Sequence, residues 1–589
     1  MAQVTFALTI RKLTRGKVTR KLGRELNHYP NIISRTFMTA TRQESEFTVA
    51  AYIARFLRQQ GIQRFWGITG GENVDLINAC YAEQIDFQLV HHENTAAFLA
   101  QNTAFLTGVP SVFLTTLGPG ATNIINAVAD AYLARLPLIV ITADFEDPTV
   151  EFATHQNAPL LELLRPITKW NVRLTPANTA DSLAYAWAVA AQGRPGPVHL
   201  ALPAAVARQT IAAVPLQASA RPTGIMDAAP LPHTAHARLT TCDAPVVVLG
   251  LEANHRLSQE AIVALVDQWG APVVNMPMSK GIFPEDHPLF AGIHSVYGYA
   301  IVDEFLAQAD CILAVGLDGS DFIHPWQTEA TTIAIHPHTE VDSAFGADYV
   351  LVGDLDATVR RLTPELTHQG DWGPRAAAAC RAKIQQRLAP KDTGEATASL
   401  TKAAVAPQAV LATLRDLTPP ETIFACDVGS HKLLSCQMWQ STQPQTFLVS
   451  NGLSTMGFGV PAALAAKLCD PERPVVCVTG DGGLLMYAGE LETVKRLAPP
   501  SNAPFVIVVF VDSTLALIRT KSEERGYAGI ENDFGHTDYV KLAAAFDLPA
   551  IHIQSEDECA AKLQEALALN RPVLVAVEID VDEYRHMGG

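Results

Sequence analysis

Two carboxylates stand where buried strands are expected to end. Asp481 lies in the segment Gly480-Asp481-Gly482-Gly483, directly after the apolar run 475–478, and Asp512 follows the next apolar run, 505–511. In open parallel sheets, ligands bind beyond the carboxyl ends of the strands, and glycines let backbone amides approach an anion closely. Two hard oxygen ligands beside exposed amides suit a Mg²⁺ ion that bridges to a diphosphate. The alternative is that Asp481 only caps the following helix.

The elements that must position these residues alternate between helix and strand from residue 46 onwards. This alternation is typical of βαβ units and a parallel sheet. The first predicted strands are 64–69, 87–93, 111–120 with its glycine turn, and 137–144, and the helices between them are 48–62, 94–108 and 121–136. After the glycines at 480–483, a helical pattern places Leu484, Leu485, Leu491 and Val494 on one apolar side.

Two segments rich in Ala, Pro or polar residues divide the chain, at 217–237 and at about 366–405. We therefore expect an α/β fold of three doubly wound parallel-sheet domains, at 46–215, 238–365 and 406–585. The second of these lacks the G-x-G-x-x-G fingerprint of dinucleotide binding. The chain also lacks the lysine motif of nucleotide hydrolases, the G-x-S-x-G elbow and HExxH, so these enzyme classes lose support.

Length and composition limit the class of protein. With 589 residues the chain is too long for one core, and 43 basic against 60 acidic side chains give a formal net charge of −17. An acidic chain disfavours nucleic acid as a partner, and no apolar run is long enough to span a membrane. Nine cysteines without a C-x-x-C pair argue against a zinc site and a disulfide framework. They suit a reducing compartment, and we expect a cytoplasmic protein.

The first 45 residues form a basic head. Within residues 1–43 the basic side chains are accompanied by a single acid, Glu25. Such an Arg-rich segment is typical of an organelle-targeting peptide. The interpretation that we favour for residues 1–45 is a disordered extension, or an upstream region in front of a working start at Met38.

Several segments together resemble one enzyme family. The Gly-Asp-Gly segment, with Asp512 after the next strand, resembles the thiamine-diphosphate signature of the pyruvate oxidase and acetohydroxyacid synthase (acetolactate synthase large subunit-like) superfamily. The further matching segments are 427–439 with the first diphosphate loop, 450–468 with the segment that grips the aminopyrimidine, 91–144 with the pyrimidine-binding domain, and 271–292 with the middle domain. The resemblance spans about 46–585 and implies pyrimidine-binding, middle and diphosphate-binding domains in that order.

The resemblance implies catalytic roles for three residues. Glu93 matches the glutamate that hydrogen-bonds N1′ of the aminopyrimidine, where a carboxylic acid in an apolar pocket can exchange a proton at neutral pH. That proton favours the imino form of the 4′-amino group, which removes the proton from thiazolium C2. Met456 matches the large apolar residue that bends the cofactor, and Gln156 matches a substrate-facing glutamine. Without the resemblance, these three would be an exposed acid, a core residue and a loop residue.

The resemblance also implies a set of cofactor and metal ligands. The residues implied around thiamine diphosphate are Gly429, Ser430, His431, Ser454, Met456, Gly480, Gly482, Gly483, Thr514 and Leu515. The residues implied for Mg²⁺ are Asp481, Asp512 and, through its carbonyl, Thr514.

Some positions depart from the family pattern. Asp512 replaces the usual Asn at the metal, which keeps an oxygen donor and adds a charge, and "QNTAF" at 101–105 replaces the family's "EGYAR". Asp318 stands where acetohydroxyacid synthases have an arginine that contacts flavin and substrate, and Pro337 stands at the acid of a ribose-binding strand end. Both weigh against FAD and against acetohydroxyacid synthase specificity. Lys280 is either retained from the family's "GKG" segment or only a surface lysine.

We therefore expect an acetolactate synthase-like transferase or lyase that depends on thiamine diphosphate and Mg²⁺. It would decarboxylate a 2-oxo acid and pass the remaining carbon unit to an acceptor carbonyl. A second hypothesis keeps the cofactor but ends in simple decarboxylation, or in cleavage or hydrolysis of a carbon–carbon bond. A third is a catalytically silent regulatory paralogue, although Glu93, Asp481 and Asp512 are all present. The resemblance implies a homodimer or homotetramer with sites between chains, and it leaves donor and acceptor open.

Overall fold

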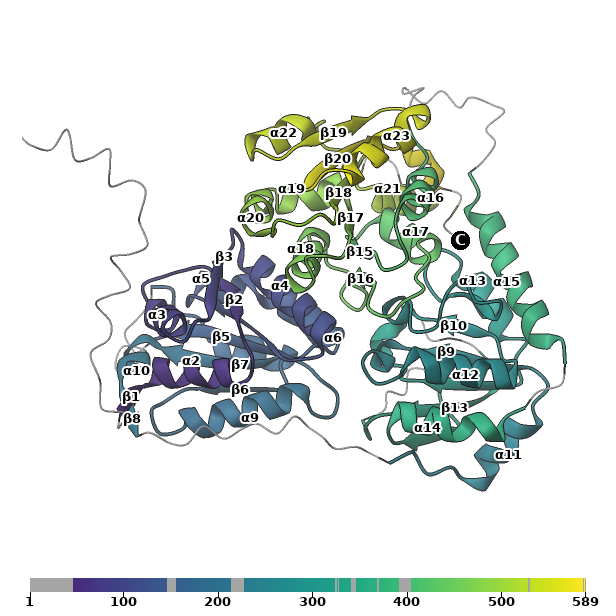
Figure 1. The fold of residues 1–589 in the computed structure, drawn as a ribbon, viewed down its shortest axis with the longest axis horizontal. Helices are drawn as coiled ribbons and strands as arrows, with labels where there is room; N and C mark the ends of the chain where they lie inside the picture. The colour runs from purple at the N-terminus through teal and green to yellow at the C-terminus, as the bar shows by residue number, and fades with distance from the viewer. Residues whose placement is uncertain are drawn as a thin grey trace, which may run out of the picture. The chain divides into compact units, whose positions relative to one another are not determined.

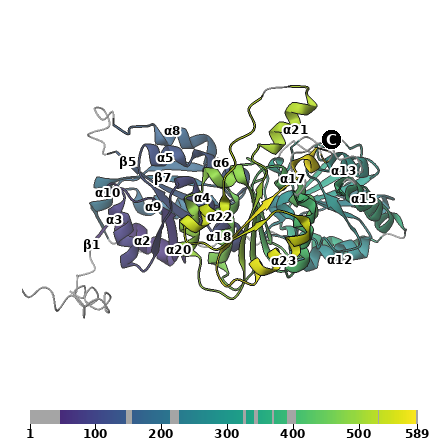
Figure 2. The same ribbon diagram turned by 90° about the horizontal axis from the view of Figure 1, so that it is seen from above.

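Three six-stranded parallel sheets account for the architecture of the described chain (Figure 1 and Figure 2). The computed structural model describes residues 46–145, 155–212, 227–323, 326, 328–340, 346–367, 370–390, 404–527, 530–585 and 587. The basic head 1–45 and residues 217–226 of the link 217–237 lie outside these residues. Residues 48–589 belong to one unit. Among the described helices, none has the length and apolar character needed to cross a membrane.

The first sheet lies between residues 64 and 203. Its strands, from edge to edge, are β3 (Asp86–Leu89), β2 (Arg64–Gly67), β4 (Ser111–Thr115), β5 (Leu138–Asp144), β7 (Val198–Pro203) and β6 (Trp170–Arg173). Its helices are α2 (Val49–Gln59), α3 (Val74–Ala82), α4 (Glu93–Thr107), α5 (Pro119–Asn123), α6 (Ile125–Leu133), α8 (Leu160–Leu164), α9 (Thr179–Ala191) and α10 (Ala204–Arg208). The inner strands β4 and β7 are buried along their whole length, as expected for a parallel sheet covered on both faces.

The third sheet repeats the strand order of the first. From edge to edge it contains β16 (Phe447–Val449), β15 (Ile423–Cys426), β17 (Val475–Gly480), β18 (Phe505–Val511), β20 (Val573–Glu578) and β19 (Ala550–Ile553). Its helices are α16 (Pro407–Leu417), α17 (Ser430–Met438), α18 (Gly459–Cys469), α19 (Asp481–Met486), α20 (Glu490–Leu497), α21 (Ala516–Glu524), α22 (Tyr539–Ala545) and α23 (Glu556–Leu567). Numbered along the chain, both sheets have the order 2-1-3-4-6-5. The two domains therefore share a topology that no repeat in the sequence indicated.

The second sheet has a different order, 3-2-1-4-5-6, which is that of dinucleotide-binding folds. Its strands are β11 (Phe290–Ile293), β10 (Val273–Asn275), β9 (Pro245–Leu249), β12 (Cys311–Val315), β13 (Thr331–His336) and β14 (Tyr349–Val352). Its helices are α11 (His233–Thr241), α12 (Gln259–Trp269), α13 (Tyr299–Leu306), α14 (Leu355–Leu362) and α15 (Trp372–Leu388). The expected fold class, three doubly wound parallel-sheet domains, is confirmed.

Helices α4 and α18 join the first and third domains (Figure 1). Each follows the second strand of its own sheet, so the two helices occupy equivalent positions. Both are buried along most of their length, and the buried residues of α4 include the polar Asn94, Gln101 and Asn102. Phe98 of α4 meets Phe458 edge to face, with ring centroids 5.8 Å apart. This contact fixes the residues at the start of both helices, where the sequence places Glu93 and Met456.

The helix predicted after the glycines at 480–483 is two helices. Helix α19 ends at Met486 and α20 begins at Glu490, so Leu484 and Leu491 are buried while Leu485 is 38% exposed. The prediction that Leu485 shares the apolar side was wrong. The prediction assumed one continuous helix, but the backbone leaves the helical conformation at Tyr487, whose φ and ψ are −132° and 31°.

The link predicted at 366–405 contains the 17-residue helix α15. Ala376, Ala377, Cys380, Ile384 and Leu388 are buried on one side of α15, which packs against α13 and β11. The sequence predicted a link here and did not predict this helix. An alanine-rich composition by itself predicts neither a buried helix nor a loop. The spacing of the apolar residues along α15 places them on one buried face.

Lys280 is not a surface lysine. Its side chain is fully buried, and its Nζ donates to both carboxylate oxygens of Glu285, at 2.9 and 2.7 Å, and to the carbonyl of Cys436 at 3.0 Å. Glu285 in turn accepts from the backbone N–H of Ser441 at 2.9 Å. The pair thus joins the second domain to the third, and the surface alternative for Lys280 was wrong.

We predict that Lys280→Met destabilises the protein by about 3–5 kcal/mol, because it leaves a buried carboxylate without its cation. The double variant Lys280→Met/Glu285→Gln should recover most of this loss, since the glutamine is neutral and can still accept from Ser441. Urea unfolding followed by circular dichroism measures both effects. Lys383→Met, which removes an exposed pair with Glu304, is the control and should cost less than about 1 kcal/mol. Equal losses for Lys280→Met and Lys383→Met would contradict the prediction.

Candidate active site

The first half of the candidate site lies at the carboxyl ends of β17 and β18. These strands pair in parallel, with Gly480 beside Phe510, so the residues that follow them are neighbours. Asp481 Oδ2 accepts the backbone N–H groups of Asp512 and Ser513, at 3.1 and 2.7 Å. Asp512 Oδ1 accepts the N–H of Thr514 at 3.1 Å. The structure therefore brings together the three residues that the sequence suggested for Mg²⁺.

Burial gives this carboxylate pair an unfavourable electrostatic environment. Burial raises the pKa of Asp481. Burial, followed by the negative charge of Asp481, raises the pKa of Asp512 to about 8. A divalent cation between the two would relieve this repulsion. Across the described residues no cluster of three or more His, Cys, Asp or Glu side chains could hold a metal, so further ligands would have to be carbonyls or diphosphate oxygens.

A cradle for an anion lies at the start of α17. Gly429 caps this helix without a side-chain hydrogen bond, which leaves its first N–H groups open to an anion. A Cβ atom on Gly429 or on Gly480 would lie 2.6 or 3.0 Å from Cε1 of His431. His431 is buried, and burial lowers its pKa to about 4, so its ring is neutral. Its Nε2 has no hydrogen-bond partner among the described residues.

Other predicted cofactor residues meet beside this cradle. A Cβ atom on Gly482 would lie 3.3 Å from Leu515 Cδ2 and 3.6 Å from Met456 Cε. Gly483 leaves room for Asp427, whose Oδ2 would be 2.6 Å from a Cβ atom there. Ser454 has a left-handed φ of 57°. These glycines therefore keep space open between Met456 and the carboxylate pair.

The second half of the site lies on the first sheet. Glu93 begins α4, and His92 caps this helix by accepting the N–H of Asn94. Asn123 donates from Nδ2 to Glu93 Oε2 at 2.9 Å, and a Cβ atom on Gly120 would lie 3.4 Å from Glu93 Oε1. Gln156 is exposed and precedes α8, and its carbonyl oxygen would lie 2.6 Å from a Cβ atom on Gly118, which follows β4. Glu93 and Gln156 thus flank one glycine turn, residues 118–120.

The two halves are separate clusters. Within the described chain, no hydrogen bond joins Glu93 to Asp481, Asp512 or the cradle at Gly429. Glu490 instead connects the two domains near Glu93: its Oε1 accepts the backbone N–H groups of His91 and His92, at 3.0 and 2.9 Å.

Sequence reasoning missed Asp427, which is buried at the centre of the first half. It follows strand β15, and its carboxylate accepts from Thr479 Oγ1 at 2.9 Å and from the N–H of Gly457 at 2.8 Å. It therefore ties the loop that carries Met456 to the end of β17. The signal that singled out Asp481, an acid directly after a buried strand, would also have found Asp427.

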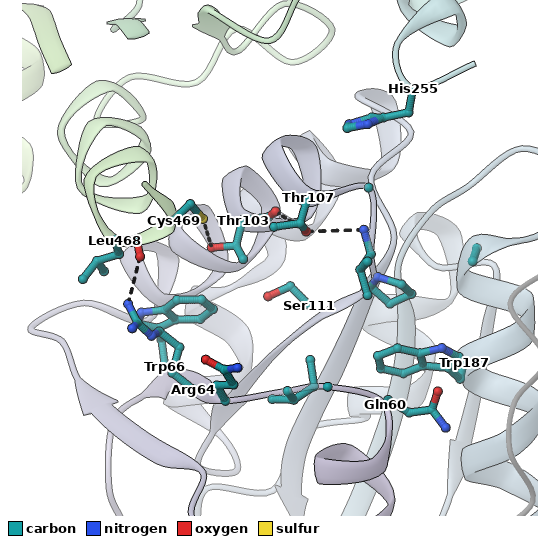
Figure 3. Close-up of a pocket in the computed structure, with 17 residues that line it drawn as sticks. Gln60, Arg64, Trp66, Thr103, Thr107, Ser111, Trp187, His255, Leu468 and Cys469 are labelled. Atoms are coloured by element: carbon teal, nitrogen blue, oxygen red, sulfur yellow. Dashed lines mark hydrogen bonds between the residues drawn. The ribbon is translucent and has the colours of Figure 1, made fainter. Parts of the chain in front are cut away.

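A different cavity, of about 670 Å³, lies beside β2 and α4 (Figure 3). Its wall includes Trp66, Trp187 and Arg64, and Arg64 donates to the carbonyl of Leu468. Cys469 and Thr103 meet on the same wall. None of the predicted site residues lines this cavity, so it is not the candidate active site.

The second sheet does not fit a dinucleotide. In this strand order the ligand binds between β9 and β12 at their carboxyl ends, but a Cβ atom on Gly250 would lie 2.5 Å from the carbonyl oxygen of Gly316 across that crevice. Asp318 is fully buried there, and both its oxygens accept from Arg135 at 2.9 Å. Glu252, also buried, adds a second acid. Both acids form ion pairs, Asp318 with Arg135 and Arg194 and Glu252 with His338. The absence of FAD stays a prediction.

Comparison with known protein families gives three matches along the chain. Residues 47–160 match the N-terminal TPP binding domain of thiamine pyrophosphate enzymes, residues 233–362 the central domain, and residues 427–577 the C-terminal TPP binding domain. The order of the matches is the order of the three sheets.

Similar proteins cover almost the whole chain. A probable acetolactate synthase large subunit of Methanocaldococcus jannaschii is 30% identical over 91% of this chain and 92% of its own length. The acetolactate synthase isozyme 1 large subunit of Escherichia coli is 30% identical over 92% and 96%. An acetolactate synthase of Bacillus subtilis is 27% identical over 93% and 96%.

We predict a pH-dependent contribution of Asp427 to stability. Burial raises the pKa of Asp427 to about 6, so the folded protein holds this proton more tightly than the unfolded chain. The contribution of Asp427 to the free energy of unfolding is complete below the unfolded-state pKa of about 4 and is lost as the pH rises through about 6. The total loss is at most about 3 kcal/mol. Asp427→Asn should remove this dependence, as measured by urea unfolding of cofactor-free protein from pH 4 to pH 7. A difference between wild type and variant that stays constant over this range would contradict the assignment.

Proposed function

We propose, from the premise that the chain belongs to the thiamine pyrophosphate enzyme family, that it acts on a 2-oxo acid with thiamine diphosphate and Mg²⁺. The proposed reaction is decarboxylation of the acid followed by ligation of the remaining carbon unit to an acceptor carbonyl. The names of the similar acetolactate synthases support this reaction type. The observation that carries the proposal is the paired arrangement of Asp481 and Asp512 beside the neutral ring of His431, whose Nε2 has no partner among the described residues.

The residues of the first half fit a bound diphosphate and its cation. In the proposal, Gly429, Ser430 and His431 receive the diphosphate together with the glycines 480, 482 and 483. Asp481, Asp512 and the carbonyl of Thr514 hold Mg²⁺. Met456, Leu515 and Ser454 contact the organic part of the cofactor. When bound, thiamine diphosphate supplies the carbon nucleophile that protein side chains lack.

Glu93 supplies the proton chemistry of the proposal. Its Oε1 would exchange a proton with the aminopyrimidine nitrogen, while Asn123 holds Oε2 in place. The start of α4 is rigid because the helix is buried against α18, so the carboxyl keeps one orientation. Gln156, on the neighbouring turn, would face the substrate. Such positioned acid–base groups typically contribute about 10²–10⁴-fold to a rate.

The separation of the two halves favours an assembly of two or more chains. Glu93 and the carboxylate pair belong to different domains and form no hydrogen bond with each other in the described chain. We propose a homodimer or homotetramer in which the Glu93 half of one chain completes the Asp481 half of another.

The reaction itself is tested with a panel of 2-oxo acids, by measuring carbon dioxide release and identifying the products. A ligated product from pyruvate alone supports the proposal. Free aldehyde as the sole product would instead indicate a non-ligating decarboxylase. Turnover of a diketone without release of carbon dioxide would indicate a carbon–carbon lyase or hydrolase.

We predict that two inactive variants restore activity when they are assembled together. Glu93→Gln should bind cofactor but lose at least about a hundredfold in rate, and Asp481→Ala should lose cofactor binding. Dimers that contain both variants have one intact site of two, so their activity should return to about half of wild type. The measurement uses two tags and tandem purification after co-expression.

The matched control combines Glu93→Gln with Asn123→Ala, which damage the same half and should not restore activity. An active monomer in sedimentation, or no recovery in the first mixture, would contradict a site between chains.

We predict different outcomes for two substitutions of Asp512. Asp512→Asn keeps an oxygen donor and should retain cofactor binding, whereas Asp512→Ala leaves Mg²⁺ under-coordinated. Thiamine diphosphate affinity should then fall steeply, and excess Mg²⁺ should restore it only in part. Calorimetric titration of cofactor into apo protein at fixed Mg²⁺ checks both variants. Wild-type affinity in Asp512→Ala would show that Asp512 is not a ligand.

A further inference from the structure

A cavity of about 810 Å³ opens beside the proposed cofactor residues Gly429 and Ser454. Its apolar wall includes Phe322 from the second domain and Leu433 and Leu517 from the third. No aspartate or glutamate lines it among the described residues. The cavity is therefore largely apolar, and the charged groups on its wall are cationic.

Lys432 is the buried cation of this cavity. It is only 3% exposed, and its Nζ donates to the carbonyl of Ser450 at 2.7 Å and to Ser454 Oγ at 2.8 Å. An ammonium group has three donors, and within the described chain the third has no hydrogen-bond partner and no carboxylate forms an ion pair with it. Asp130 is reached only through Ser450, whose Oγ donates to it at 2.5 Å.

The other cations on the wall differ from Lys432. Arg135 is occupied by both carboxylate oxygens of Asp318. Lys521 is exposed at the rim, where water screens its charge. Burial lowers the pKa of Lys432, and the charge of Asp130, the nearby buried acid, opposes this shift. An anion that enters the cavity would find in Lys432 a desolvated ammonium group with one hydrogen-bond donor left over.

In the proposed reaction, the anion that could reach Lys432 is a substrate carboxylate. The chemistry of decarboxylation decides whether it is the carboxylate that leaves or one that is retained. A cation on the carboxylate that leaves as carbon dioxide would stabilise the starting state more than the transition state and slow that step. A cation on a carboxylate that is retained carries no such penalty. In the proposed reaction, the retained carboxylate is that of an acceptor 2-oxo acid.

We propose that Lys432 binds the carboxylate of the acceptor and thereby makes a 2-oxo acid, not an aldehyde, the preferred acceptor. Phe322, Leu433 and Leu517 receive its apolar substituent, which defines the substrate class as an aliphatic 2-oxo acid. This inference rests on the proposed function, because it assigns a residue to the second half of that reaction.

The test compares Lys432→Met and Lys432→Gln with wild type in carbon dioxide release and in product ratio. Decarboxylation should continue in both variants, while ligation to a 2-oxo acid falls by about tenfold to a hundredfold, the usual effect of losing a charge-assisted hydrogen bond. Free aldehyde should accumulate in its place. Ligation to an added uncharged aldehyde should stay within about twofold of wild type. Lys521→Met, the matched control at the rim, should leave the product ratio unchanged.

A second readout does not depend on turnover. Saturation-transfer NMR should detect propanoate on the wild-type protein and a weaker signal on Lys432→Met, while propanamide gives equal signals on both. Thiamine diphosphate affinity, measured by calorimetry, should be the same in wild type and both variants.

Each alternative outcome has a distinct meaning. An unchanged product ratio in both Lys432 variants would overturn the inference. Loss of cofactor affinity together with decarboxylation would also overturn it, and would make Lys432 a positioning residue for the Ser454 loop. If wild type released no carbon dioxide from any 2-oxo acid, the proposed function itself would fail, and this inference with it.

Discussion

The direction of the strands is the constraint on which the rest of this structure depends. Because neighbouring strands of each sheet are parallel, all of them end at the same edge. In the third sheet, the ends of β15, β17 and β18 are adjacent, and this places Asp427, Asp481 and Asp512 around one small space. Glycines 429, 480 and 482 keep that space open. In the first sheet, Glu93 follows β3 and the turn at 118–120 follows β4, the strands on either side of β2, so both lie at the carboxyl ends of the strands.

Buried charge is the second organising element. The junctions between domains are closed by polar groups that lose water and must find partners. Lys280 meets Glu285, Arg135 meets Asp318, and Glu490 accepts backbone N–H groups on the first domain. Each contact has a defined geometry and therefore fixes how neighbouring domains meet. Lys432 is the contrasting case, since its charge faces a cavity and no described carboxylate pairs with it.

The predictions that failed share a physical cause. The helix after Asp481 and the link at 366–405 were inferred from local pattern, and both were decided by packing. Lys280 carries no sequence signal of burial, because the third-domain groups that enclose its pair with Glu285, the carbonyl of Cys436 and the N–H of Ser441, are far away in the chain. Asp427 was within reach of sequence reasoning, since it obeys the same rule as Asp481. The pattern of parallel sheets was predicted correctly because hydrophobic period and turn residues are properties of short segments.

The amino-acid sequence by itself determined the fold class, the approximate positions of the three α/β units and the family to which the chain belongs. These follow from local periodicity and from motifs whose residues are close in the chain. Only the tertiary structure decided that the first and third sheets share one strand order, that Lys280 and Asp318 are buried in ion pairs with Glu285 and Arg135, respectively, and that Glu93 and Asp481 lie in separate clusters. The physical reason is that strand order, burial and ion pairing depend on residues far apart in sequence, and their partners exist only once the chain has folded.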